Sequence, residues 1–135
     1  MNNFMIPVPG KITSPFGLRK HPITGRDSFH NGIDIACKVG TPVVAPDYGM
    51  VTEVWSHEQG GLCLAIENLD GVRFGFAHLS KRLVKKDQPV LKGQVIALSG
   101  NTGRSTGPHL HFTVKKLGVW VDPTLDFYNG VVSSE

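Results

Sequence analysis

Turn-forming residues recur so often along this chain that long helices have little room between them. The 135 residues include 16 Gly and 9 Pro, the residue types that most strongly mark turns and loops. The segments between these turns are short and have strand character. They span residues 33–37, 41–45, 50–55, 62–68, 72–78, 94–99 and 109–114. We therefore expect an all-β or β-dominated domain with a small antiparallel sheet or sandwich core.

The pattern also predicts one tight turn and one short helix. Asp70-Gly71 lies between two of the expected strands, and Asp-Gly in this position is a strong hairpin signal. The only helical candidate is a stretch at about residues 79–84, which allows little more than one turn. Consecutive strands are thus expected to pair as antiparallel meanders.

Length and composition indicate one ordinary globular domain. The 135 residues fit a single domain over 1–135, because domains commonly contain about 100–150 residues. Hydrophobic residues make up 40% of the chain, and no apolar run is long enough to cross a membrane. The net charge of +3 arises from scattered cations. We therefore expect neither membrane insertion nor nucleic-acid binding.

The cysteines and the N-terminal residues bear on whether the protein is exported from the cytoplasm. Cys37 and Cys63 have neither a C-x-x-C spacing nor a second cysteine pair, which excludes a zinc ribbon. We expect free thiols rather than a disulfide between them. Residues 1–7 contain neither a basic n-region nor a sustained apolar h-region, so no secretory signal peptide is expected.

The segment that begins at His109 alternates between polar and apolar residues. In a strand, Leu110 and Phe112 would face the core, while His109 and His111 would share the opposite face. A single histidine there would usually be a surface or a satisfied core residue. Two imidazoles at positions i and i+2 favour a metal site instead, although H-x-H also occurs by chance.

His30 and Asp34 form a second candidate pair. Their four-residue spacing places both on one side of a helix or of a strand, and Gly32 with its neighbours Ile33 and Ile35 favours the strand. An imidazole and a carboxylate together suit zinc. In isolation, a simple His–Asp hydrogen bond would be the better interpretation of this pair.

Together the two pairs supply three metal ligands, namely His30, Asp34 and either His109 or His111. Three protein ligands leave the fourth position of a tetrahedral zinc ion open, which is typical of a catalytic site. The remaining histidine of H-x-H would lie close enough to take or give a proton. His78, at the end of an expected strand, is a further candidate for the same face.

The other motifs carry less evidence of a function. His21 and His57 are flanked by polar or turn residues, and we expect both to be exposed loop residues without a role. Serine or cysteine catalysis finds little support, because the chain has no G-x-S-x-G elbow and no histidine next to a cysteine in sequence. The glycine-rich segment 100–107 lacks the G-K-[ST] ending of a P-loop. We expect it to form a constrained turn at the rim of the site.

These residues lie within motifs that resemble the lysostaphin-type, or LytM-like, zinc metallopeptidases, which cut peptidoglycan peptides. The motifs are I-T-S-P-F-G-L-R at 12–19, H-P-I-T-G at 21–25, H-x-x-x-D at 30–34, G-T-P-V at 40–43, A-H-L-S at 77–80, K-G-Q-V-I at 92–96 and the segment 99–112 that ends in H-L-H-F. The resemblance extends from about residue 7 to about residue 127, which is the expected peptidase core.

The resemblance implies a division of roles that the spacing leaves open. It implies that His30, Asp34 and His111 bind one zinc ion, and that His78 and His109 are a catalytic pair outside the metal shell. In the implied reaction, zinc polarises the scissile carbonyl and holds a water molecule that one imidazole activates as general base. The sequence does not decide which histidine is that base.

The resemblance also implies a fold and a substrate. The fold would be the lysostaphin-type, duplicated hybrid motif-like fold, in which loops close a groove over an antiparallel β core. The substrate would be a stem or cross-bridge peptide of bacterial peptidoglycan, and we expect a monomer that acts on the cell wall from its extracellular or periplasmic face. Without a signal peptide, the protein would be a phage or prophage lysin, a virion-associated protein or a part of a longer exported protein.

Three other functions compete with this interpretation. A degenerate LytM-like domain binds or regulates without cutting, but such domains lose zinc ligands, and all five key residues are present here. A biotinyl or lipoyl carrier would resemble segments 45–51 and 90–96, but the sequence lacks the modifiable lysine, commonly in M-K-M, that such carriers need. A structural virion component that only binds the wall is the third.

Overall fold

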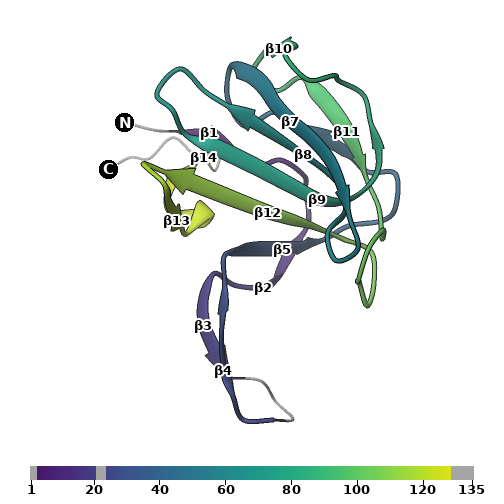
Figure 1. The fold of residues 1–135 in the computed structure, drawn as a ribbon, viewed down its shortest axis with the longest axis vertical. Helices are drawn as coiled ribbons and strands as arrows, with labels where there is room; N and C mark the ends of the chain where they lie inside the picture. The colour runs from purple at the N-terminus through teal and green to yellow at the C-terminus, as the bar shows by residue number, and fades with distance from the viewer. Residues whose placement is uncertain (1–2, 21–23, 129–135) are drawn as a thin grey trace.

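Antiparallel strand pairing organises the molecule. The computed structural model describes residues 3–20 and 24–128. The strands of its main sheet are β2 (Lys11–Ser14), β5 (Gly32–Ala36), β6 (Pro42–Val44), β7 (Gly49–His57), β8 (Gly61–Glu67), β9 (Arg73–Arg82), β10 (Pro89–Val90), β11 (Val95–Ser99), β12 (His109–Lys116) and β13 (Val119–Val121). Seven of them follow the order β10-β7-β8-β9-β12-β5-β2 (Figure 1), while β11 pairs with β6 and β9 and β13 pairs with β12. The prediction of an antiparallel all-β domain is confirmed.

Two smaller pairings complete the fold. β3 (Gly17–Lys20) and β4 (Asp27–His30) are antiparallel and form an arm that extends away from the main sheet (Figure 1). β1 (Phe4–Met5) pairs in parallel with β14 (Phe127–Tyr128), which joins the two ends of the described chain. A single residue, Asn31, separates β4 from β5, so the base of the arm continues directly into the sheet.

The expected hairpin at Asp70-Gly71 is present between β8 and β9, which pair in antiparallel fashion. Gly71 adopts a φ of 78°, a left-handed conformation that glycine reaches at little cost. The side-chain oxygen of Asn68 accepts hydrogen bonds from the backbone N–H groups of Asp70 at 3.0 Å and Val72 at 2.9 Å. This Asx-type turn helps to fix the register between β8 and β9.

The prediction of a short helix at about residues 79–84 is wrong. Leu79 is fully buried and β9 continues through Arg82, because residues 79–82 pair with β11. Within the described residues the one helix is η1, a 3-10 helix at Pro123–Asp126, which begins with the Asp122 side chain accepting from the backbone of Thr124. Asp-Pro is an ordinary helix start signal that could have indicated this turn.

Four of the strands before residue 31 also escaped prediction, namely β1 to β4, and so did the short β10, β13 and β14. Most of them are edge or arm strands without a clean alternation of buried and exposed residues. Cys37 and Cys63 are free thiols, as expected. The described part of the chain contains no helix long and apolar enough to cross a membrane.

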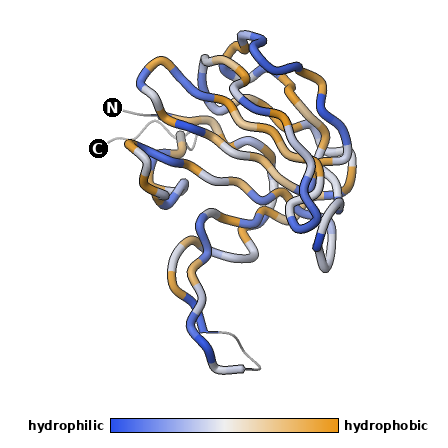
Figure 2. Tube along the Cα trace, in the orientation of Figure 1, coloured by the Kyte–Doolittle hydropathy of each residue, from blue (hydrophilic) through white to orange (hydrophobic). Residues whose placement is uncertain are grey.

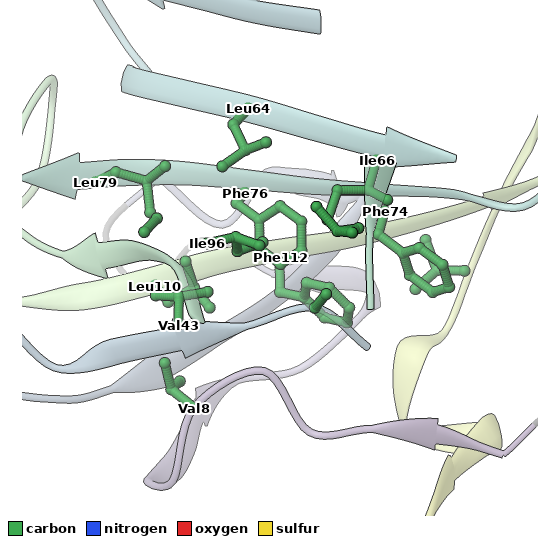
Figure 3. Packing of buried hydrophobic residues seen from close by; sticks show 14 of the residues in the cluster. Val8, Val43, Leu64, Ile66, Phe74, Phe76, Leu79, Ile96, Leu110 and Phe112 are labelled. Atoms are coloured by element: carbon green, nitrogen blue, oxygen red, sulfur yellow. The ribbon is translucent and has the colours of Figure 1, made fainter. Parts of the chain in front are cut away.

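Phenylalanine rings form the centre of the core (Figure 3). Phe112 of β12 lies 5.3 Å from Phe76 and 6.2 Å from Phe74, measured between ring centroids, and the latter ring meets Phe4 edge-on at 4.8 Å. All four side chains are at most 1% exposed. Hydrophobic stretches accordingly run along the strands of the sheet in Figure 2. The core therefore ties the two ends of the chain to the middle of the sheet.

The central strands present different chemistry on their two faces. In β12, Leu110 and Phe112 are 0% exposed, whereas His109 and His111 are only half-buried. The apolar side chains pack in the core, and the imidazoles therefore lie on the opposite, open face of the sheet.

We predict that Phe112→Ala lowers the free energy of unfolding by about 3–5 kcal/mol, because it removes a buried ring and leaves a cavity beside the rings of Phe74, Phe76 and Phe127. Urea denaturation measures this change. Leu69→Ala is the matched control, since Leu69 is 97% exposed, and its cost should stay within about 0.5 kcal/mol. Equal costs for the two variants would contradict this description of the core.

Candidate metal centre and catalytic cleft

The antiparallel register of β5 and β12 places an acid opposite an imidazole. Asp34 and His111 are direct cross-strand partners, and both belong to the open face of the sheet. Their side chains meet with the Nδ1 atom of His111 2.9 Å from the Oδ1 atom of Asp34. His109, two residues earlier in β12, points its Nε2 atom at the same oxygen from 3.7 Å.

His30 reaches the same carboxylate from the end of β4. Its Nε2 atom lies 3.5 Å from Asp34 Oδ1. In one continuous strand, residues four apart would be separated by about 13 Å, at about 3.3 Å per residue. The chain instead bends at Asn31, between β4 and β5. The expectation that His30 and Asp34 lie along one strand is therefore wrong, and the bend is what brings them together.

His30, Asp34 and His111 form a candidate metal centre. Each offers one ligand atom, and these atoms all lie within 4.8 Å of one another. Two imidazole nitrogens and one carboxylate oxygen are the donor set of many catalytic zinc sites. A nitrogen and an oxygen as close as those of His111 and Asp34 also need a proton or a cation between them, because two bare lone pairs repel. The residues present thus fit a zinc ion.

His78 and His109 lie beside this centre. Their ring centroids are 4.7 Å apart, and His78 lies 6.3 Å from the ring of His111. Strand alternation would place His78 with Phe74 and Phe76 in the core. His78 instead adopts a φ of 62°, and the register between β8 and β9 shifts at this point. This bulge turns the imidazole onto the open face.

His78 was expected at the end of a strand, but β9 continues for four residues beyond it. The backbone of His78 is left-handed within that strand. Such a conformation costs about 1–2 kcal/mol in a residue other than glycine. Its backbone N–H is held by Gly60 O at 2.7 Å. Strained residues of this kind gather at functional sites.

Three of the four clustered histidines are oriented by backbone carbonyls. The Nδ1 atoms of His30, His78 and His109 donate to Pro15 O at 2.9 Å, Thr102 O at 2.7 Å and Gly107 O at 2.8 Å, respectively. A carbonyl oxygen can only accept, so in each neutral ring the proton is on Nδ1 and the lone pair on Nε2. All three rings therefore present a basic Nε2 atom.

Burial keeps two of these imidazoles neutral. Desolvation is the main cause that lowers the pKa of His30 and of His78 below the ordinary 6.5, and neighbouring imidazoles lower it further. Their hydrogen bonds to Pro15 and Thr102 oppose the shift without cancelling it. Neutral imidazoles can bind a metal or accept a proton, whereas charged ones can do neither.

The carboxyl group of Asp34 behaves in the opposite way. Burial raises its pKa, but the hydrogen bond from His111 and the charges of His111, His30 and His109 outweigh that effect, so the pKa lies below its ordinary range. Asp34 is therefore ionised at neutral pH and is ready to bind a cation.

An open cleft of about 590 Å³ contains this cluster. Beyond the histidines, its walls include Trp55 of β7, Arg73 and Gly75 of β9, and Trp120 of β13. The Arg73 guanidinium lies 5.6 Å from the Trp55 ring and pairs with Glu53. The cleft therefore extends from the candidate metal centre along the open face of the sheet.

The structure brings together all five residues named from the sequence, His30, Asp34, His78, His109 and His111, within one cleft. Residues 104–106 line its rim, as expected of the glycine-rich segment. His57 is exposed but ends β7 and lines the cleft, so its placement in a loop is wrong. His21 lies outside the described residues.

Sequence reasoning missed several residues of the cleft. Asn31 contacts His111, and its place between His30 and Gly32 in the H-x-x-x-D motif was the available signal. Trp55 and Trp120 had no clear signal, because the register of β7 shifts between Val51 and Glu53 and β13 is only three residues long. The carbonyl groups that orient the histidines gave no signal, because every residue has one.

Comparison with known proteins agrees with this geometry. A family model described as "Peptidase family M23" matches residues 28–123, more than half of the chain. The peptidoglycan DD-endopeptidase ShyB of Vibrio cholerae is 50% identical over 105 residues, which are 77% of this chain and 25% of that protein. The chain spans about a quarter of the length of the curated relatives it matches.

Solved structures share the fold. A zinc-containing peptidase from Vibrio cholerae has a TM-score of 0.84 at 46% identity, covering 89% of this chain and 39% of that one. The catalytic domain of lysostaphin from Staphylococcus simulans has a TM-score of 0.76 at 36% identity, covering 86% of this chain and 90% of that domain. The resemblance drawn from the sequence motifs is confirmed.

We predict that the metal-free protein loses stability as the pH falls below about 6.5. The unfolded chain binds protons at the ordinary histidine pKa, whereas His30 and His78 bind them only at lower pH, so acid favours the unfolded state. Urea denaturation with a chelator between about pH 7.5 and about pH 5.5 measures this loss. His78→Gln should show a smaller loss, because one buried imidazole is gone. An equal loss in both proteins would contradict the assignment.

Proposed function

Because the chain belongs to peptidase family M23, we propose that it is a zinc-dependent endopeptidase domain that hydrolyses peptide bonds in the stem or cross-bridge peptides of bacterial peptidoglycan. One observation carries the proposal. Three metal-ligand side chains and two further imidazoles, which come from the four strands β4, β5, β9 and β12, converge in one open cleft.

In this proposal, one zinc ion is held by His30 through Nε2, by Asp34 through its carboxylate and by His111 through Nδ1. The support is that these atoms face one another, with distances to Asp34 Oδ1 of 3.5 Å and 2.9 Å for the two nitrogens. When bound, zinc supplies Lewis-acid polarisation of the scissile carbonyl and lowers the pKa of water.

His78 and His109 are the proposed catalytic residues. Each donates its Nδ1 proton to a carbonyl and keeps a free lone pair on Nε2. One Nε2 atom takes a proton from the attacking water, and the other ring, once protonated, stabilises negative charge on the scissile oxygen or gives a proton to the leaving amine. The two rings lie on different strands, so their tasks can differ.

The cleft suits an extended peptide. Its floor on β9 contains Gly75 and Ala77, which project little or no side chain, and Trp55 and Trp120 stand on its walls. Aromatic walls with a few polar groups are common in ligand sites. The 50% identity to a DD-endopeptidase, against 36% to lysostaphin, favours a D,D cross-link over a glycine bridge as the scissile bond.

The proposal includes the place of action and the assembly. The domain acts on the cell wall as a monomer, either as a bacteriolytic phage or prophage lysin, as a virion-associated protein or within a longer exported protein. The alternative, a non-catalytic module that only binds the wall, would not need two imidazoles with free Nε2 atoms beside a complete ligand set.

We predict that His109→Ala retains zinc but loses about 10²–10⁴-fold in the rate of hydrolysis of purified peptidoglycan, because a proton-transfer group is gone. His111→Ala should lose zinc itself. Metal content after dialysis and release of soluble muropeptides measure the two effects. The variants are each other's control, since the same side chain is removed at two positions of one strand.

An inactive but zinc-loaded wild-type protein would favour the binding module over the peptidase. Loss of metal in His109→Ala, with retention in His111→Ala, would reverse the proposed roles of the two histidines.

A further inference from the structure

His111 is oriented differently from the other three histidines of the cleft. Its Nε2 atom lies 3.0 Å from Oδ1 of the Asn31 side chain, and its Nδ1 atom faces Asp34. The other three rings rest on backbone carbonyls through Nδ1 and present Nε2. Within the cluster, His111 is thus the ring that presents Nδ1, and the group that orients it is a side chain.

The contact with Asn31 determines which nitrogen of His111 carries the lone pair. An amide oxygen accepts a hydrogen bond, so the Nε2 atom of His111 donates and bears the proton. Nδ1, the atom nearest Asp34, is then the nitrogen left for a cation: in the metal-free protein a proton on Nδ1 is donated to the carboxylate, and a bound metal ion would take the place of that proton. If the ring carried its only proton on Nδ1, its lone pair would be on Nε2, which faces Asn31 and not Asp34.

The bend between β4 and β5 holds Asn31 in place. Asn31 follows His30 directly, and Gly32 after it lies so close to β12 that an added Cβ atom would come within 2.2 Å of Phe112 O. Phe112 is the neighbour of His111 in β12. The backbone next to Asn31 is therefore packed closely against the strand that carries His111.

We propose that Asn31 is a positioning residue that selects the Nε2–H form of His111 and so keeps Nδ1 available as a zinc ligand. A hydrogen bond from a neighbouring side chain to the far nitrogen of a metal-binding histidine typically changes metal affinity by about 10–100-fold. The inference rests on the proposed role of His111 as a ligand, but it concerns a residue that neither touches the metal nor takes part in proton transfer.

The test compares Asn31→Ala, Asn31→Asp and the control Asn3→Ala, which removes the same amide from an exposed residue. Zinc affinity is measured by competition with a chromophoric chelator. We expect Asn31→Ala to bind zinc about 10–100-fold more weakly. Asn31→Asp should stay within a few-fold of the wild type, because a carboxylate also accepts from Nε2–H. The control should not change.

Nitrogen-15 NMR of the histidine rings reports which nitrogen of His111 carries the proton. This signal would not change if Asn31 only stabilised the fold. In the zinc-loaded wild type and in Asn31→Asp, the His111 signals should show a protonated Nε2 and a metal-bound Nδ1. In Asn31→Ala the Nε2 proton should exchange faster with water. Saturating zinc should restore most of the hydrolysis rate of Asn31→Ala, since its catalytic residues are intact.

Unchanged zinc affinity in Asn31→Ala, or equal weakening in Asn31→Ala and Asn31→Asp, would overturn the inference. Urea denaturation of the metal-free variants shows whether a weaker zinc affinity comes from misfolding. If Asn31→Ala is misfolded, the comparison of Asn31→Asp with the wild type still tests the inference, because the carboxylate keeps an acceptor for Nε2–H. Loss of zinc in His111→Ala with no effect of Asn31→Ala would refute this inference alone. Retention of zinc in His111→Ala would refute the proposed ligand set as well.

Discussion

The pairing of β12 with β5 on one side and β9 on the other is the constraint on which the rest of the structure depends. It buries Leu110, Phe112 and Val114 in the core, and by the same alternation it exposes the H-x-H histidines to the cleft. Its register sets His111 directly opposite Asp34. A slip by one residue would move the imidazoles into the core and the apolar side chains into the cleft, so stability and function share one register.

Two departures from regular β structure complete the cluster. The bend at Asn31 brings His30 to within 3.5 Å of Asp34, and the left-handed backbone at His78 turns its ring out of the core and toward His109. The left-handed backbone of His78 costs conformational energy, which the contacts of the surrounding sheet offset. The proposed ligands and catalytic residues are therefore placed partly by regular pairing and partly by local exceptions to it.

Hydrogen bonds then determine which nitrogen of each imidazole carries a proton. Carbonyl oxygens of Pro15, Thr102 and Gly107 orient three of the histidines, and the Asn31 side chain orients the fourth. Burial lowers the pKa of His30 and His78, while the histidines around Asp34 keep its carboxyl ionised. These residues thus suit the cation binding and the proton transfer that we propose for the cleft.

The sequence by itself determined the β class, the strands β5 to β9, β11 and β12, the hairpin at Asp70-Gly71 and the five residues of the cluster, because alternation, turn chemistry and donor type are local properties. It did not determine the path of residues 79–82, where pairing with β11 overrides local preference, or the side of the sheet that His78 occupies. Nor could it show which nitrogen each imidazole presents. Only the tertiary structure decided these, because they depend on which backbone and side-chain groups the fold brings next to each residue.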